Sequence, residues 1–269
     1  MIDLTQEQKT LHLQLELLQK EFSDLFSKKN EMLTFEENFL TAIFLNTIGR
    51  KRYQVYCLTI DIATIMQRIK LIQSYLNRNE RPDLSAIDKE IKNRFSEYQK
   101  KIEEEAEKLA AANEYLKTGF LSEDETRKLK NAYRVIVKKL HPDINPNLTE
   151  YQKDLFVKAQ AAYDLCDLNT LNEILLSLNM NTSSPTIVDP IDLKTYISTL
   201  EQNITKLKGQ ILVLENRFPF SYREKLADTK WIESEQQSLD IEITLLEKEK
   251  NRNAEYMLLL QLWKPESLN

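Results

Sequence analysis

Residues 129–146 read LKNAYRVIVKKLHPDINP, and this stretch decides the fold of the region around it. Its apolar residues recur at helical spacing and share one face, which predicts a half-buried helix: Leu129, Ala132, Tyr133, Ile136 and Leu140. Pro142 disfavours helical geometry in the residue before it, so the helix is expected to end at His141. The tripeptide His141-Pro142-Asp143 then opens a loop.

The opposite side of the same helix carries cations with no acid between them: Arg127, Lys130, Arg134 and Lys138. Lys138 and Lys139 fall in the last turn, where positive charge complements the helix dipole. Taken alone, such a stripe is more often a solvated helix face than a binding surface. A binding role therefore depends on the tripeptide beside it.

A second amphipathic helix is expected to start at Thr149, which forms a capping-box pair with Gln152. Its apolar side is Leu155, Phe156, Ala159, Ala162, Tyr163 and Cys166. Antiparallel packing of the two helices would bury both apolar faces against each other. We expect this arrangement to leave the polar loop and the basic stripe exposed.

At this point the chain resembles a J-domain, the module of DnaJ-like co-chaperones. The residues that carry the resemblance to its second helix and signature loop are Leu129-Lys130-x-Ala132-Tyr133-Arg134 and Lys138-Lys139-x-His141-Pro142-Asp143-x-Asn145-Pro146. Phe156 and Ala159-Gln160-Ala161-Ala162-Tyr163 are similar to its third helix, so the resemblance covers residues 122–168. Tyr115 and Gly119 align with the end of the family's first helix. No short fourth helix with a basic-acidic signature is expected after Asp167.

The resemblance implies a partner and a role for each matched residue. J-domains bind a DnaK-type (heat-shock) chaperone ATPase, stimulate its ATP hydrolysis and so lock client protein onto it. His141, Pro142 and Asp143 would be the HPD motif needed for stimulation, with Asp143 contacting an arginine of the ATPase. The docking cations would be Arg127, Lys130, Arg134, Lys138 and Lys139. Because complementary charge mainly raises the association rate and sets orientation, high salt should weaken docking.

The flanks of this segment are predicted to be helical. One helix is expected over 5–28, a second over 34–77 with a start at Thr34, and a charged, coiled-coil-like one from about Ser85, after Arg81-Pro82-Asp83 interrupts the chain. Residues 191–214 repeat apolar positions in steps of four and three, which is typical of a coiled-coil seam. A last helix is expected from Ser221 to about Trp263, folding back on 191–214 as an antiparallel hairpin.

These patterns divide the chain into an N-terminal helical region (1–83), a charged helix (84–118), a J-like domain (119–180), a linker (181–190) and a C-terminal helical hairpin (191–269). If that hairpin captures clients, deleting 191–269 should abolish capture and spare ATPase stimulation. The same apolar stripes could instead join two copies of the chain.

Composition excludes several classes of function. Only 3 Gly among 269 residues leave no glycine-rich phosphate loop, and the 2 cysteines, Cys57 and Cys166, give no metal-ligand spacing. A formal net charge of -5 does not suit a general nucleic-acid binder, and no apolar stretch has the roughly 20 residues of a membrane span. The start of the chain lacks a signal-peptide pattern. We expect a cytoplasmic protein with no cofactor or metal, and with neither nucleic acid nor membrane as a partner.

The sequence therefore predicts an all-α co-chaperone that is not an enzyme, whose helical flanks bind an unidentified client or drive self-association. It shows no nucleophile with a base and no acid-base pair. The alternative is a structural coiled-coil scaffold that carries an inactive J-like module.

Overall fold

The structure is a computed structural model that describes residues 6–117, 121–180 and 190–262. Every regular element in these ranges is a helix, and they contain no strand, which confirms the expected all-α fold.

The backbone stays helical from Gln6 to Leu76. It forms α1 (Gln6–Glu31), the π-helical segment η1 (Met32–Glu36), α2 (Glu37–Phe44), a second π-helical segment η2 (Leu45–Gly49) and α3 (Arg50–Leu76). The predicted helix start at Thr34 is wrong, because Thr34 lies inside η1 and its hydroxyl donates to the Asp164 carboxylate (3.1 Å). Neither proline nor glycine occurs between Lys28 and Thr34, so nothing ends the first helix there. The predicted start of the first helix, Thr5, lies outside the described residues.

The chain divides into two compact units, each built from segments distant in sequence. Unit 1 comprises 1–39 and 119–221, and unit 2 comprises 40–118 and 222–269. The boundary after 118 coincides with an expected division, but the divisions expected at 83, 180 and 190 fall inside units, and the boundaries after 39 and 221 were not expected. Apolar periodicity shows that a helix needs a partner but not which helix the partner is. Except for Pro190, the expected linker lies outside the described residues.

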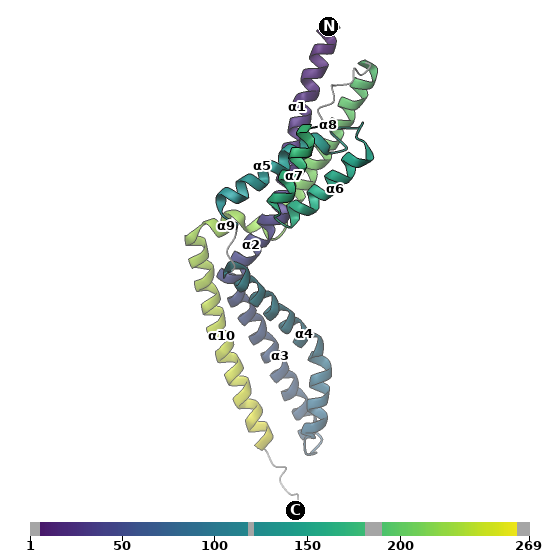
Figure 1. Cartoon of the computed structure of the whole chain (residues 1–269). Helices are drawn as coiled ribbons and strands as arrows, with labels where there is room; N and C mark the ends of the chain where they lie inside the picture. The colour runs from purple at the N-terminus through teal and green to yellow at the C-terminus, as the bar shows by residue number, and fades with distance from the viewer. Residues whose placement is uncertain (1–5, 118–120, 181–189, 263–269) are drawn as a thin grey trace, which may run out of the picture. The chain divides into compact units, whose positions relative to one another are not determined.

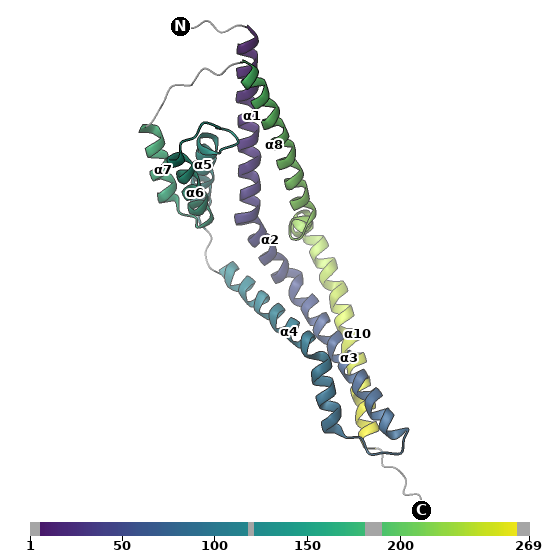
Figure 2. The same cartoon turned by 90° about the vertical axis from the view of Figure 1, so that its right-hand side faces the viewer.

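In unit 1, α8 (Pro190–Asn216) packs along α1 (Figures 1 and 2). The two helices run parallel, since Lys194 pairs with Glu7 at 2.6 Å and, a constant 187 residues apart, Lys28 pairs with Glu215 at 2.8 Å. All the predicted seam residues are buried: Leu193, Ile197, Leu200, Ile204, Leu207, Ile211 and Leu214. The seam is thus confirmed, but the expected antiparallel hairpin with the last helix is corrected, because α8 has α1 as its partner.

Unit 1 also contains α5 (Glu123–Leu140), α6 (Glu150–Asp164) and α7 (Leu168–Met180), which pack on one another, and α5 packs on α1. The capping box predicted at Thr149 is present, and Ser122 forms another with Glu125, which has the same sequence pattern. Helix α7 was not expected after Asp167. The Asp167 carboxylate begins it by accepting from the backbone N–H of Thr170 at 3.0 Å.

Unit 2 combines α3 with α4 (Leu84–Lys117) and α10 (Thr229–Leu262). Asp83 caps α4 by accepting from the backbone N–H of Ala86 (3.0 Å), close to the predicted start. Helix α10 runs parallel to α3, as ion pairs join Lys51 to Asp240 (2.5 Å) and Asp61 to Lys250 (2.6 Å).

The start predicted for the last helix, Ser221, is wrong. Ser221 lies in the 3-10 segment η3 (Phe220–Tyr222), which is followed by the short α9 (Arg223–Ala227). Asp228 caps α10 instead, by accepting from the backbone N–H of Lys230 at 3.0 Å. The Ser-x-x-Glu pattern of Ser221 and Glu224 therefore does not start the last helix. Its N-cap is Asp228, seven residues after Ser221.

Candidate functional site

Helices α5 and α6 run antiparallel and meet at the loop that holds the His-Pro-Asp tripeptide. Their direction follows from two ring contacts, Tyr133 on Tyr163 (centroids 4.1 Å apart) and His141 on Phe156 (5.0 Å). His141 ends α5 in an extended conformation (φ -69°, ψ 128°), as expected for a residue before proline. Its carbonyl accepts from the backbone N–H groups of Ile144 and Asn145, both at 3.0 Å, which gives the loop a fixed turn.

The core under this loop is aromatic. Tyr133 and Tyr163 stack with an interplanar angle of 16° and are almost fully buried. Burial raises the pKa of both hydroxyls above the ordinary value. Asn30 of α1 donates to the Tyr133 hydroxyl at 2.8 Å, so α1 satisfies a polar atom of the core that α5 and α6 form.

His141 is buried, with only 8% of its surface exposed. Its ring lies among Phe22 (4.8 Å between centroids) and Phe26 (4.4 Å) of α1 and Phe156 of α6, all in edge-on geometry. Nδ1 accepts from the backbone N–H of Asp143 at 3.1 Å, which leaves the proton of the neutral ring on Nε2. Burial lowers the His141 pKa to about 4, while the negative charge of Asp143 opposes that shift. The expectation of an exposed loop is therefore wrong at His141.

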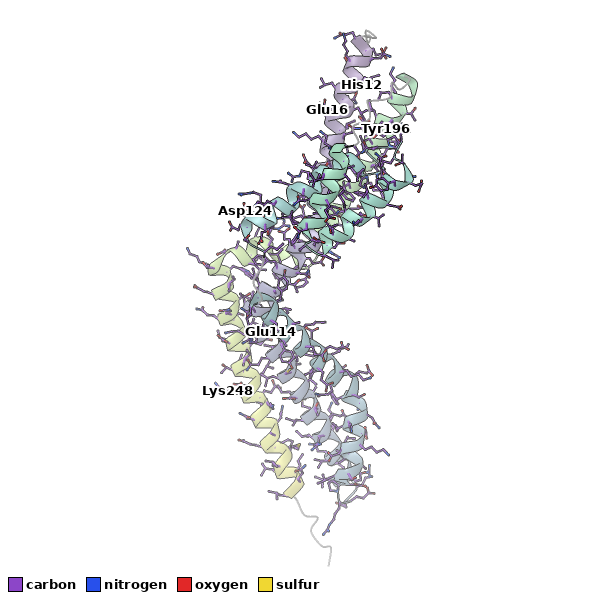
Figure 3. The ribbon with its side chains drawn as sticks, in the orientation of Figure 1. His12, Glu16, Glu114, Asp124, Tyr196 and Lys248 are labelled. Atoms are coloured by element: carbon purple, nitrogen blue, oxygen red, sulfur yellow. The ribbon has the colours of Figure 1, made fainter. Side chains whose placement is uncertain are left out.

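The rest of the loop is divided between solvent and protein. Pro142 and Asp143 are exposed, whereas Ile144 is buried. The Ile144 carbonyl accepts from the Gln19 side-chain amide of α1 (3.1 Å) and from the Tyr196 hydroxyl of α8. Figure 3 labels Tyr196 on α8. Burial raises the Tyr196 pKa above the ordinary value, so its hydroxyl keeps its proton as a donor.

Two of the predicted docking cations carry ion pairs with α1. Lys130 is half-buried and pairs with Glu31, and its ammonium also lies 5.8 Å from the centre of the Phe35 ring. The Nε atom of Arg134 lies 3.5 Å from the Asp24 carboxylate. The basic stripe has no acid between its own cations, but two acids of α1, about a hundred residues earlier in the chain, pair with it.

The remaining predicted cations face solvent. Arg127 is exposed and pairs within α5 with Asp124, which Figure 3 labels. Lys138 and Lys139 are exposed in the last turn of α5. The backbone carbonyl of Lys138 accepts from the Asn145 side chain at 3.1 Å, which fastens the loop to the end of the helix. The structure thus brings His141, Pro142, Asp143, Lys138 and Lys139 to one end of α5, with Lys130, Arg134 and Arg127 behind them.

Sequence reasoning missed the residues of α1 and α8 that belong to this site: Gln19, Phe22, Asp24, Phe26, Glu31 and Tyr196. In the sequence, Phe22 and Phe26 recur at helical spacing with Leu11, Leu15 and Leu18, so the need for an apolar partner was visible. The sequence carries no signal that assigns this face to the His141 loop, because the contact spans more than a hundred residues.

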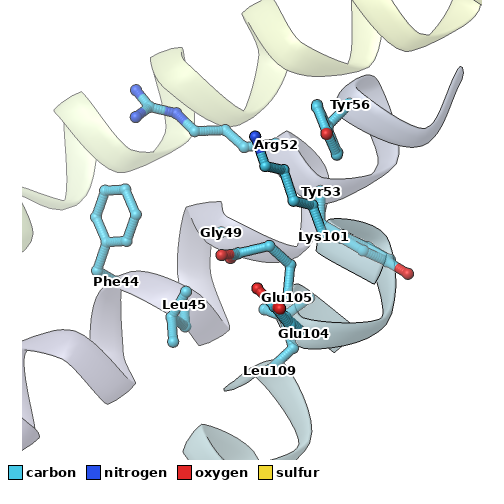
Figure 4. A pocket seen from close by; sticks show the side chains of 10 residues that line it. All are labelled: Phe44, Leu45, Gly49, Arg52, Tyr53, Tyr56, Lys101, Glu104, Glu105 and Leu109. Carbon is cyan, nitrogen blue, oxygen red and sulfur yellow. The ribbon is translucent and has the colours of Figure 1, made fainter. Parts of the chain in front are cut away.

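A hollow of about 610 Å³ lies in unit 2, where α4 faces α3 and the residues just before it. Figure 4 shows its lining, in which Lys101, Glu104 and Glu105 of α4 face Tyr53 and Tyr56 of α3. Its charges have both signs and include no nucleophile next to a base. In the described part of the chain, no group of three or more His, Cys, Asp or Glu side chains is placed to hold a metal ion.

None of the described helices is both long enough and apolar enough to cross a membrane. Comparison with known proteins finds no matching protein-family model, no matching curated protein and no matching solved structure.

Proposed function

We propose that the chain is a J-type co-chaperone that docks on a DnaK-type chaperone ATPase and stimulates its ATP hydrolysis. The observation that carries the proposal is the antiparallel pair α5 and α6, with His141-Pro142-Asp143 at its connection and the five predicted docking cations along α5. The motif and the two helices occur together in the order and spacing of the family they resemble.

In this proposal the chain performs no chemistry of its own and needs no cofactor. The exposed Asp143 carboxylate contacts an arginine of the ATPase, and the cations of α5 meet an acidic surface on it. Electrostatic complementarity of this kind steers the encounter and fixes the orientation of the two proteins. The protein is proposed to act in the cytoplasm, with neither nucleic acid nor membrane as a partner, and its helical flanks bind the client or a second copy of the chain.

The test is single-turnover ATP hydrolysis by a DnaK-type chaperone, with wild-type chain and Asp143→Asn. Because the Asp143 side chain is exposed, this change leaves the folded core intact. We expect wild type to accelerate hydrolysis, Asp143→Asn to lose that acceleration, and high salt to reduce it. The matched control is Asp154→Asn, an exposed acid on α6, which should behave as wild type.

His141→Gln is a less clean probe, because His141 packs against three phenylalanine rings and its loss also disturbs the core. Equal, negligible stimulation by wild type and Asp143→Asn that persists after α1 is released from α5 would contradict the proposal.

The second candidate is a structural scaffold with an inactive J-like module. The burial of His141 under α1 favours it, since a partner has no direct access to that ring in this conformation. The assay above separates the two candidates only if the conformation of α1 is also controlled.

A further inference from the structure

Helix α1 makes three kinds of contact with the proposed docking surface, and each uses residues that the partner would need. The first is ionic. Glu31 pairs with Lys130, and Asp24 lies 3.5 Å from Arg134. A chaperone that approaches with acidic groups finds these two cations already paired with carboxylates.

The second contact is aromatic. Phe22 and Phe26, one helical turn apart on α1, place their rings 4.8 Å and 4.4 Å from that of His141. Together with Phe156 of α6, these rings surround the imidazole with apolar side chains and shield it from solvent. The histidine of the motif is therefore covered by α1, while Pro142 and Asp143 beside it remain exposed.

The third contact is to the backbone. Gln19 of α1 and Tyr196 of α8 both donate to the carbonyl of Ile144, one residue after the motif. Ser23 donates to the backbone carbonyl of Arg134 at 3.3 Å, which places α1 directly along the basic side of α5. Since α1 is itself held along its length by α8, the two helices form one body against the docking surface.

We infer that α1, braced by α8, is an autoinhibitory cover that occupies the chaperone-docking surface in cis and must be displaced before His141, Lys130 and Arg134 can engage the partner. The inference rests on the proposed function. It adds a closed form of low activity and an open form of high activity, with the exposed Asp143 and Lys138 as the surface of first contact. A partner that binds only the open form shifts the population toward it.

The experiment compares the closed chain with variants that remove the cover. Asp24→Lys with Glu31→Lys reverses both ion pairs with α5. The matched control, Glu16→Lys with Glu173→Lys, makes the same change of net charge at exposed acids of α1 and α7 for which the structure shows no ion pair. Figure 3 labels Glu16 on α1. Phe26→Ala is an independent opening variant that leaves every charge in place.

Opening is measured first, by hydrogen exchange of the amides of α1 and of the 141–145 loop. ATP hydrolysis by a DnaK-type chaperone is then measured at a subsaturating concentration of the chain. We expect both opening variants to exchange faster and to stimulate about tenfold more than wild type, a size typical of coupling between two binding events. The control pair should match wild type, and adding Asp143→Asn to an opening variant should abolish the gain.

The results distinguish failure of the inference from failure of the proposed function. Equal stimulation by wild type and opened variants, lost with Asp143→Asn, leaves the proposed function standing and overturns the cover. Unchanged exchange in both opening variants also overturns it, because the named contacts then do not hold α1 in place. Absence of stimulation by every variant, with exchange showing that α1 is released, overturns the proposed function and the inference together.

Discussion

At the residue scale, His141 shows what the sequence can and cannot reveal. Its position before Pro142 predicts the end of α5, and the structure has that end at Leu140 with His141 extended. Its burial depends on Phe22 and Phe26, which lie more than a hundred residues earlier in the chain. No local pattern encodes such a contact. The sequence therefore predicted an exposed His141 ring, whereas the fold buries it.

The burial of His141 predicts a pH-dependent stability. The folded pKa of about 4 lies below the ordinary histidine value of 6.5, so the unfolded chain binds the proton more tightly. Stability is therefore fully present above about pH 6.5 and is lost as the pH falls toward 4, by about 3 kcal/mol for the whole shift. The neighbouring charge is that of Asp143, and the three packed rings carry none.

The measurement is urea unfolding of wild type and His141→Gln at about pH 7 and about pH 5. Wild type should lose roughly 2 kcal/mol more than the variant between these conditions. The other histidine, His12, is present in both proteins and cancels. Identical pH dependence in the two proteins would show that His141 is not buried as a neutral ring.

At the scale of single elements, the same capping pattern starts a helix at some positions of the chain and not at others. Ser122 and Thr149 each bond reciprocally with the residue three positions later. Thr34 has the same pattern, but the helix before it does not end, so its hydroxyl bonds elsewhere. A cap motif therefore marks a start only where the preceding residues cannot continue the helix.

Thr149→Ala is expected to lower the free energy of unfolding by about 1 kcal/mol, because the free backbone N–H of Gln152 loses its acceptor. Thr205→Ala, an exposed threonine inside α8, is the control and should be neutral or slightly stabilising, since alanine favours helix interiors. Chemical denaturation measures both. An equal loss of stability in the two variants would mean that the cap contributes nothing of its own.

The seam of α8 was predicted residue by residue, while its partner was predicted incorrectly. Steps of four and three specify an apolar stripe and leave open which other stripe covers it. Leu200→Ala should therefore cost about 2–5 kcal/mol and raise hydrogen exchange in α1. Leu212→Ala, at an exposed leucine of the same helix, should change little. Faster exchange in α10 with α1 unchanged would instead restore the hairpin that the sequence suggested.

At the scale of the whole molecule, the chain passes from one unit to the other three times, after residues 39, 118 and 221. Each unit therefore needs segments from both halves of the sequence. Composition shifts and linkers, the usual signals of a boundary, follow the order of the chain. They cannot reveal a unit that the first 39 residues form together with residues 119–221.

This arrangement changes what removal of 191–269 would do. The sequence alone suggested a detachable client-binding hairpin, so that truncation would spare ATPase stimulation. In the structure, the truncation strips α8 from α1 and α10 from α3. It uncovers the side of α1 that faces α8 and the cluster around Ile72, against which Met257 and Leu260 of α10 pack. We expect the truncated chain to melt at lower temperature and to self-associate, because large apolar surfaces lose their cover.

The measurements are thermal unfolding followed by circular dichroism, and size-exclusion chromatography of the truncated and full-length chains. A monomeric truncated chain with an unchanged melting curve would contradict the assignment of α8 and α10 as core helices. If the truncated chain is folded yet stimulates ATP hydrolysis more strongly than the full chain, the stronger stimulation follows from the loss of α8. Without α8, the cover formed by α1 loses both its brace and the Tyr196 bond to the loop, and the docking surface opens.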